Sequence, residues 1–387
     1  NIIQAQNPFF EKYSTPYGTI PFEKIKTEHY EPAIREGINR HNAEIDAITN
    51  NPEAATFANT VAAYEKSGEL LNQVSTVFGN LLSAETNDDM QELAKSIMPL
   101  LSEHGNNITL NEKLFARIKA VYDQKDQANL TPEQNKLLEK VYNSFVRSGA
   151  NLEGEAKEQY RALSKELSLL TLQFGENNLK ETNDYKLVLT DPAQLAGLPQ
   201  SATETAKEKG VEGWVFTLQA PSYSPFMTYA SNRDLRCKLY MAYNTKCTHD
   251  NETNNLEIVK KLVNTRLAIA QLLGYSSFAE YNLQERMAEN SGNVYKLLDQ
   301  LLDAYTPTAK QEYAEVEALA RQLEGSDFTV MPWDWSYYSH KLKDQKFQID
   351  DEMLRPYFEL SKVKEGVFGL ATRLYGITFK KNSDIPV

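Results

Sequence analysis

Cysteine and histidine are scarce in this sequence, and their spacing excludes two kinds of site. The chain has two cysteines, Cys237 and Cys247, which lie in one segment that we expect to be helical. A disulfide between distant parts of the chain is therefore not expected, and both cysteines are interpreted as core thiols. The five histidines are scattered singly, without a His-Glu-x-x-His pattern. The residues themselves predict neither a disulfide framework nor a zinc site.

Long apolar runs and an excess of basic residues are also missing. No apolar run approaches the roughly 20 residues that a membrane-spanning helix needs. Lys and Arg total 41 against 53 Asp and Glu, so the formal net charge is −12. This balance argues against a nucleic-acid surface or a polybasic membrane patch, and it favours neutral or locally basic partners. With 387 residues, of which 41% are hydrophobic, the chain can bury a sizeable core.

Common catalytic and nucleotide-binding motifs do not occur either. The sequence has no Gly-x-Gly-x-x-Gly, no phosphate-binding Gly-Lys-Ser/Thr and no Gly-x-Ser-x-Gly. Possible metal ligands gather between Cys247 and Glu252, but polar turns of this kind are more often surface connections. Motifs alone therefore identify no catalytic chemistry.

Apolar residues at helical spacing are abundant. The clearest stripe lies in residues 153–179, where Tyr160, Leu163, Leu167, Leu170 and Phe174 are separated by three or four positions. Similar patterns predict helices at 27–49, from Thr56 through Leu82, at 88–103, 111–126, 131–147, 232–243, 255–273 and 291–323, the last with a kink or break at Pro307.

Only two short runs have strand character, 185–190 and 213–218, and they bracket a helix-like segment at 200–209. We therefore predict a mainly α fold with one small β insertion. No linker or charge block divides the chain, which favours one continuous helical body. Its expected parts are an extended arm at 1–27, a helical part at 28–182, the β insertion at 183–220 and a second helical part at 221–387.

The segment Met331–Lys343 combines aromatic residues, an acid and a histidine at a helix start. Trp333, Tyr337 and Tyr338 fall near one face of that helix, beside Asp334. Packing in a core or between domains is one interpretation. Because Trp and Tyr carry polar tips, lining of a wet cleft is the other. These four residues are candidates for a substrate channel.

Arg233 and Arg236 add two further candidates. They lie three residues apart and share one helical turn, so together they can hold a carboxylate. The alternative is an ordinary solvated or salt-bridged helix face.

Several segments of the sequence are informative as an ordered set. They are Pro21–Ile25, His29–Ile34, Thr56–Val61, Tyr64–Leu71, Phe174–Leu179, Asn232–Arg236, Met331–Tyr338, Leu354–Leu360 and Leu374–Ile377. In this order, the segments resemble the thimet-oligopeptidase-like zinc metallopeptidases, and within that family the bacterial peptidyl-dipeptidases. The resemblance covers nearly the whole chain.

The resemblance implies a helical half-shell that forms one wall of a deep substrate channel, with 221–387 contributing channel wall. The family's zinc ligands and its general-base glutamate correspond to positions beyond Val387, so no catalytic or metal-binding residue is predicted within this chain. The cofactor implied for the full-length protein is zinc, and the partners are an oligopeptide substrate and the C-terminal catalytic portion.

The activity implied is release of dipeptides from the C-terminus of oligopeptides by a zinc metallopeptidase, with residues 1–387 inactive on their own. An endo-acting oligopeptidase of the same family and a non-enzymatic helical interaction module remain alternatives. A bacterial protein is expected, in the cytoplasm or the periplasm. The absence of an initial Met fits a cleaved export signal or a shortened chain equally.

Overall fold

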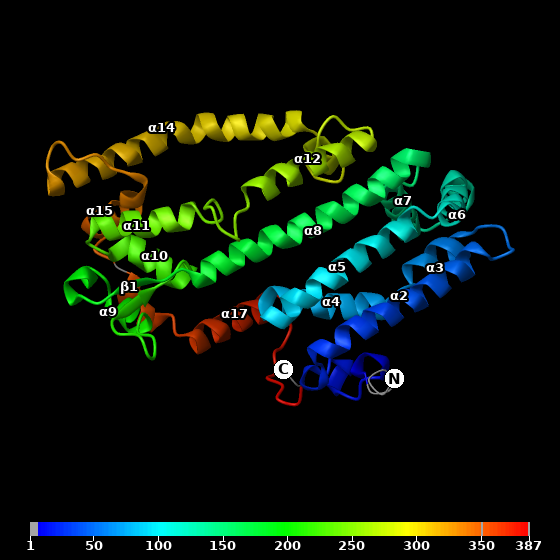
Figure 1. Ribbon diagram of the computed structural model, residues 1–387, viewed down its shortest axis with the longest axis horizontal. Helices are drawn as coiled ribbons and strands as arrows, with labels where there is room; N and C mark the ends of the chain where they lie inside the picture. The colour runs from blue at the N-terminus through cyan, green and yellow to red at the C-terminus, as the bar shows by residue number, and fades with distance from the viewer. Residues whose placement is uncertain (1–6, 350, 386–387) are drawn as a thin grey trace. The chain divides into compact units, whose positions relative to one another are not determined.

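Residues 7–349 and 351–385 are described by a computed structural model (Figure 1). Residues 1–6 of the predicted arm lie outside this range. Within the described residues, contacts divide the chain into two compact units: unit 1 draws on 7–173, 259–282 and 382–385, and unit 2 on 174–258, 283–349 and 351–381. The long helix α8 (Gly154–Asp184) contributes to both units and confirms the amphipathic segment expected at 153–179.

Unit 1 is built from helices whose starts are fixed by side-chain caps. Asn87, Asn111 and Thr131 each accept a hydrogen bond from the backbone N–H three residues later. The helices are α2 (Thr27–Thr49), α3 (Ala62–Glu65), α4 (Glu69–Ala84), α5 (Asp88–Thr109), α6 (Glu112–Asp123) and α7 (Pro132–Arg147), with most of α12 (Leu256–Leu272) and α13 (Phe278–Leu283). Short turns are η1 (Pro8–Phe10), η2 (Pro16–Gly18), η3 (Phe22–Lys24), the π-helix η4 (Phe57–Val61) and η5 (Lys125–Gln127).

Two apolar clusters hold unit 1 together. The first packs α2, α4 and α5 around Ile34, Phe78 and Ile97. At Gly37 a Cβ would lie 2.9 Å from the Leu71 Cα, so glycine permits the close approach of α2 to α4. The second cluster joins α6 and α7.

The helix expected from Thr56 through Leu82 is interrupted at Gly68. That residue has a φ of +73°, a conformation that favours glycine, and it immediately precedes α4. Its backbone N–H donates to Glu44 Oε2 at 2.6 Å. The hydrophobic spacing runs through this point, which is why the sequence did not reveal the break.

Unit 2 contains the predicted β insertion. Strands β1 (Leu187–Leu189) and β2 (Trp214–Phe216) pair antiparallel, with Leu187 opposite Phe216. Gly213 allows this pairing, because a Cβ there would lie 2.2 Å from the Leu189 carbonyl oxygen. Within the described residues this is the only sheet, and the mainly α fold class is confirmed.

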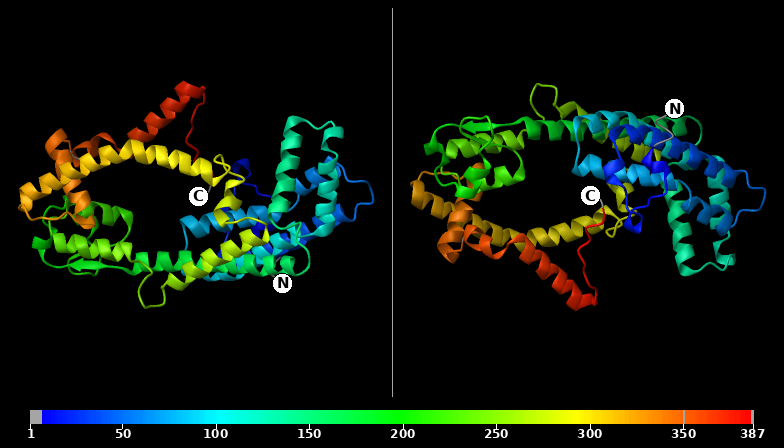
Figure 2. Two further views of the ribbon diagram at one scale, coloured as in Figure 1. Left: turned by 90° about the horizontal axis from the view of Figure 1, so that it is seen from above. Right: turned by 90° about the horizontal axis from the view of Figure 1, so that it is seen from below.

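The remaining elements of unit 2 are helical. They are η6 (Pro192–Leu195), α9 (Gln200–Thr205), α10 (Ala220–Tyr229), α11 (Arg233–Asn244), α14 (Ser291–Glu324), η7 (Pro332–Asp334), α15 (Trp335–Phe347), α16 (Asp351–Leu354), η8 (Arg355–Tyr357) and α17 (Leu360–Tyr375). Helix α14 continues through Pro307 instead of breaking there. Helix α15 packs against α14 (Figure 2). Among the described helices, none is long and apolar enough to cross a membrane.

Candidate functional site

Asp334 is the centre of a buried ionic cluster in unit 2. It lies at the end of η7, and its carboxylate faces the first turn of α11. Arg233 donates to it through Nη2 at 2.7 Å and through Nε at 3.1 Å, and Arg236 Nη2 donates at 2.8 Å. The Met331 N–H donates to Oδ2 at 3.0 Å. The Asp334 side chain is fully buried, whereas the side chains of Arg236 and Arg233 are 1% and 40% exposed.

Backbone carbonyls around the cluster accept further hydrogen bonds from the two arginines. Arg236 donates to the carbonyl oxygens of Ala230 at 2.8 Å and Trp333 at 3.3 Å. Arg233 Nη2 also donates to the Thr329 carbonyl at 2.9 Å. The cluster therefore ties the start of α11 to both η7 and the loop before it.

These contacts keep Asp334 ionised. Burial by itself would raise the pKa of its carboxyl group. Hydrogen bonds from Arg233, from the Met331 N–H and from Arg236 outweigh burial and hold the pKa below its usual value. Charge-assisted hydrogen bonds of this kind are stronger than neutral ones, which makes the cluster a rigid support.

Aromatic rings cover the arginines. The Arg236 guanidinium carbon lies 4.1 Å from the centre of the Tyr337 ring, and that of Arg233 lies 4.4 Å from the Phe328 ring. Tyr337 and Tyr338 meet edge to face, with their centroids 5.0 Å apart. The Tyr338 hydroxyl donates to Glu324 Oε1 at 2.9 Å, and burial, followed by this contact, raises the pKa of Tyr338.

The structure thus brings the side chains of five of the six candidate residues into one contact network: Arg233, Arg236, Asp334, Tyr337 and Tyr338. Trp333, the sixth, joins this network through its backbone carbonyl only. Its ring packs against the Tyr240 ring, with the ring centroids 6.2 Å apart. The arginine pair does hold a carboxylate, but that carboxylate is Asp334 of the same chain. Tyr337 and Tyr338 are buried, so only Trp333 and Arg233 offer partly exposed surface.

Other residues of this region were missed or lie apart. Phe328 and Glu324 were not expected from the sequence. They approach the cluster only because the chain reverses after α14 and α15 packs back against that helix. His340 packs against Tyr229 at 4.6 Å, and its Nε2 lies 3.9 Å from Asp344 Oδ2.

A second polar site lies in unit 1, in a pocket of about 890 Å³. His104 Nε2 lies 2.9 Å from His41 Nδ1, and His41 Nε2 lies 3.1 Å from Ser67 Oγ. Because Ser67 donates its own proton to the Tyr64 carbonyl, His41 Nε2 donates to Ser67, and neutral His41 accepts from His104. Burial and the neighbouring His41 lower the pKa of His104 to about 4. The two histidines are 63 residues apart, and nothing in the sequence paired them.

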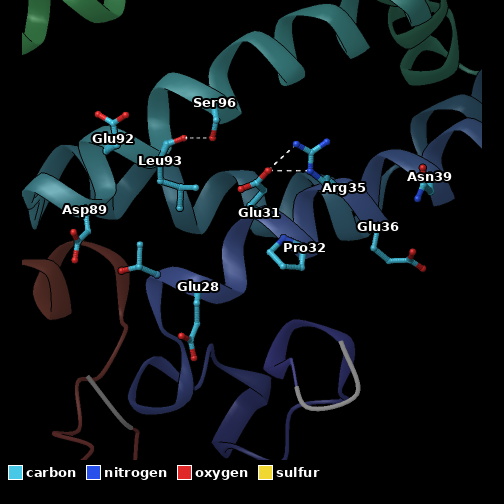
Figure 3. Close-up of a pocket in the computed structure, with 11 residues that line it drawn as sticks. Glu28, Glu31, Pro32, Arg35, Glu36, Asn39, Asp89, Glu92, Leu93 and Ser96 are labelled. Atoms are coloured by element: carbon cyan, nitrogen blue, oxygen red, sulfur yellow. Dashed lines mark hydrogen bonds and ion pairs between the residues drawn. The ribbon is translucent and has the colours of Figure 1, made fainter. Parts of the chain in front are cut away.

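A second hollow, of about 790 Å³, lies between α2 and α5 (Figure 3). It is lined by the carboxylates of Glu28, Glu31, Glu36, Asp89 and Glu92. Arg35 offsets part of this charge through Glu31, at 2.6 Å. These groups lie largely at the surface, and no role is assigned to them.

No three His, Cys, Asp or Glu side chains gather as potential ligands of one metal ion in the described part of the chain. The described residues therefore do not supply the three protein ligands that catalytic zinc usually needs.

Comparison with known sequences supports the resemblance. The sequence model of peptidase family M3 matches residues 226–387, the region that contains Arg233, Arg236 and Asp334. Similarity to known peptidases extends over the rest of the chain. The chain is 35% identical over 389 residues to a dipeptidyl carboxypeptidase of Escherichia coli K12, and the alignment covers 99% of this chain. Residues 226–387 thus match peptidase family M3, and the whole chain is similar to known peptidases.

Two further relatives show the breadth of the match. Oligopeptidase A of Escherichia coli K12 is 32% identical over 381 residues, and saccharolysin of Saccharomyces cerevisiae is 25% identical over 363 residues. The alignments cover 96% and 90% of this chain. They cover only 57%, 56% and 49% of the dipeptidyl carboxypeptidase, oligopeptidase A and saccharolysin, respectively. The chain thus spans about half the length of these relatives.

Proposed function

We propose that this chain is the N-terminal part of a longer zinc metallopeptidase that hydrolyses oligopeptides and releases dipeptides from their C-termini. The observation that carries the proposal is the 35% identity, over 99% of the chain, to a protein named dipeptidyl carboxypeptidase. Similarity to oligopeptidase A favours a second candidate, an endo-acting oligopeptidase of the same family.

Zinc is the proposed cofactor of the whole protein, where it would polarise the scissile carbonyl and activate water. Its ligands are proposed to lie outside residues 1–387. No step of peptide hydrolysis is assigned to this chain, because the described residues offer no set of metal ligands.

The reading frame of the gene provides a first check of the proposal. A His-Glu-x-x-His segment after Val387 supports the enzyme, whereas a stop codon there favours a non-enzymatic helical module.

Substrates with free and amidated C-termini separate the two enzymatic candidates. The whole protein is expected to convert a free-acid peptide into successive dipeptides. Amidation is expected to slow this release by at least about tenfold, since a site that binds a charged group rejects the analogue lacking it. Mass spectrometry of timed samples identifies the products. Equal cleavage of both peptides at internal bonds would contradict the dipeptide specificity and support the endo-acting alternative.

Residues near the ionic cluster are proposed to stand at or just behind the substrate channel. Trp333 and Arg233 are the partly exposed members, and buried Arg236 and Asp334 fix the turn that presents them. The buried Tyr337 ring packs against the guanidinium group of Arg236.

Conservative substitution of the two tyrosines tests this placement. Tyr337 is only 8% exposed, and the proposal assigns substrate contact to its hydroxyl alone, so Tyr337→Phe is expected to reduce kcat/KM of the whole protein with little change in melting temperature. Tyr338→Phe is the matched comparison: it removes the hydrogen bond to Glu324, and a stability loss of about 1 kcal/mol is expected. Unchanged peptide hydrolysis with a lowered melting temperature in both variants would assign both tyrosines to packing.

A further inference from the structure

Helix α14 carries an apolar stripe that is covered at one end only. Toward its N-terminus, Tyr295, Leu298, Leu301, Leu302 and Tyr305 recur at helical spacing, and all are exposed. Lys296, Asp299 and Asp303 occupy the other side of the same turns. The first half of the helix is therefore amphipathic, yet its apolar side faces solvent in this structure.

The covered end of α14 shows what this stripe is suited to contact. Val316 and Ala320 pack in one apolar cluster with residues of α15, and Leu319 is also buried. Val316, Leu319 and Ala320 follow Leu298, Leu301 and Leu302 by 18 residues, which is five turns at 3.6 residues per turn, so both triplets lie on one helix face. Leu319 is 8% exposed, whereas Leu302 is 65% exposed. One helix face thus serves as a packing interface toward its C-terminal end and carries a bare apolar stripe toward its N-terminal end.

Helix α17 repeats the pattern. Leu360, Val363, Val367, Leu370 and Leu374 follow one another at steps of three and four, and each is exposed. Within the described chain α17 has no buried residue. A 16-residue helix without tertiary packing is marginal in water, because most helical stability in proteins comes from burying such a face.

We infer that the bare stripes of α14 and α17 are docking faces for the part of the whole protein that lies outside residues 1–387, which covers them with an apolar surface of its own. Both helices lie in the region that matches peptidase family M3, and the chain spans 57% of the dipeptidyl carboxypeptidase it resembles. The inference rests on the proposed function only in taking the whole protein to be longer than this chain.

The extent of the exposed surface favours this occupant over solvent. Two stripes, each of five large apolar residues, are exposed in unit 2, and contiguous apolar patches on soluble proteins usually mark contact surfaces. The α14 stripe shares a helix face with the α14–α15 interface, which indicates that this face suits permanent helix packing. A second copy of the chain is the competing occupant, and the experiment below distinguishes the two.

Thiol labelling in the whole protein tests the inference. Leu302→Cys and Val367→Cys report on the two stripes, and Lys296→Cys and Glu365→Cys report on the opposite sides of the same helices. A Cys237→Ser background removes the half-buried native thiol, and Cys247 stays slow because burial raises its pKa to about 11.

In the whole protein, the two stripe cysteines are expected to react at least about tenfold more slowly than their controls. In residues 1–387 all four are expected to react at similar rates. Similar rates in the whole protein would overturn the inference. Protection that appears in residues 1–387 as their concentration is raised would instead identify a second copy as the occupant.

Hydrogen exchange of the unmodified proteins guards against misfolded variants. Slower amide exchange in residues 295–305 and 360–375 of the whole protein than in residues 1–387 is expected, and equal exchange would contradict docking. Peptide hydrolysis is measured on the same samples. A hydrolysing protein with bare stripes would refute this inference alone, whereas protected stripes without hydrolysis would refute the proposed function alone.

Discussion

Replacing Asp334 with asparagine is expected to lower the free energy of unfolding by about 3–5 kcal/mol, a large fraction of the stability of a typical domain. The substitution removes the charge that balances Arg236, whose side chain is 1% exposed and cannot reach water for compensation. Arg233 loses less, because 40% of its side chain is already exposed. Urea denaturation followed by circular dichroism measures the change.

The matched control is Asp327→Asn, which removes a carboxylate from an exposed position in the same unit. A change within about 0.5 kcal/mol is expected there, as for most surface substitutions. A loss below about 1 kcal/mol for Asp334→Asn would contradict the view that the buried charges depend on one another.

A double replacement separates the ionic pair from the packing around it. Removing Asp334 alone leaves Arg236 as an uncompensated buried charge, whereas Arg236→Met combined with Asp334→Leu removes both buried charges and keeps apolar volume. The double variant is therefore expected to be more stable than Asp334→Leu alone.

The contribution of Asp334 also has a pH dependence. Because its folded pKa lies below the unfolded value of about 3.9, its stabilisation is present above that value and is lost as the pH falls through the folded pKa.

Local patterns in the sequence predicted the elements that local forces determine. The β insertion followed from two β-prone runs, and Gly213 explains why the second strand can approach the first. The helices followed from apolar spacing and caps such as Thr131, which forms a capping box with Gln134. Gly68 escaped this reasoning, because its interruption of the helix depends on a carboxylate from α2.

The candidate site was only partly predictable for a related reason. The spacing of Arg233 and Arg236 placed them on one turn and suggested a bound carboxylate. It could not identify that carboxylate as Asp334, 98 residues later than Arg236, because the pairing depends on how α11 and η7 pack. The same limit applies to His41 and His104, whose contact joins two helices that the sequence separates by 63 residues.

The stripes of α14 and α17 illustrate what sequence patterns contain and what they leave open. Their spacing predicts helices with one apolar face, and the structure shows those helices. The surface that should cover them cannot be inferred from periodicity, since any apolar face of matching length would satisfy it. The relatives' greater length is what directs the inference toward the remainder of the same protein.

Residues 1–387 on their own are expected neither to hydrolyse peptides nor to hold one zinc ion per chain, although the proposed whole protein does both. Catalytic zinc usually requires three protein ligands held in a fixed geometry. His340 has one acidic neighbour, Asp344 at 3.9 Å, and His249 has Glu181 at 3.7 Å. Two groups at such separations are too few to retain the metal through dialysis.

Metal analysis after dialysis and a quenched-peptide assay, applied to both proteins, measure this difference. The whole protein is expected to retain about one zinc per chain and to lose hydrolysis when a chelator removes it, since activity depends on the bound metal. Residues 1–387 are expected to show background cleavage that the chelator does not change. A tightly held zinc in residues 1–387, together with chelator-sensitive cleavage, would show that this chain contains its own metal site. In that case, the proposal that the ligands lie outside it would be wrong.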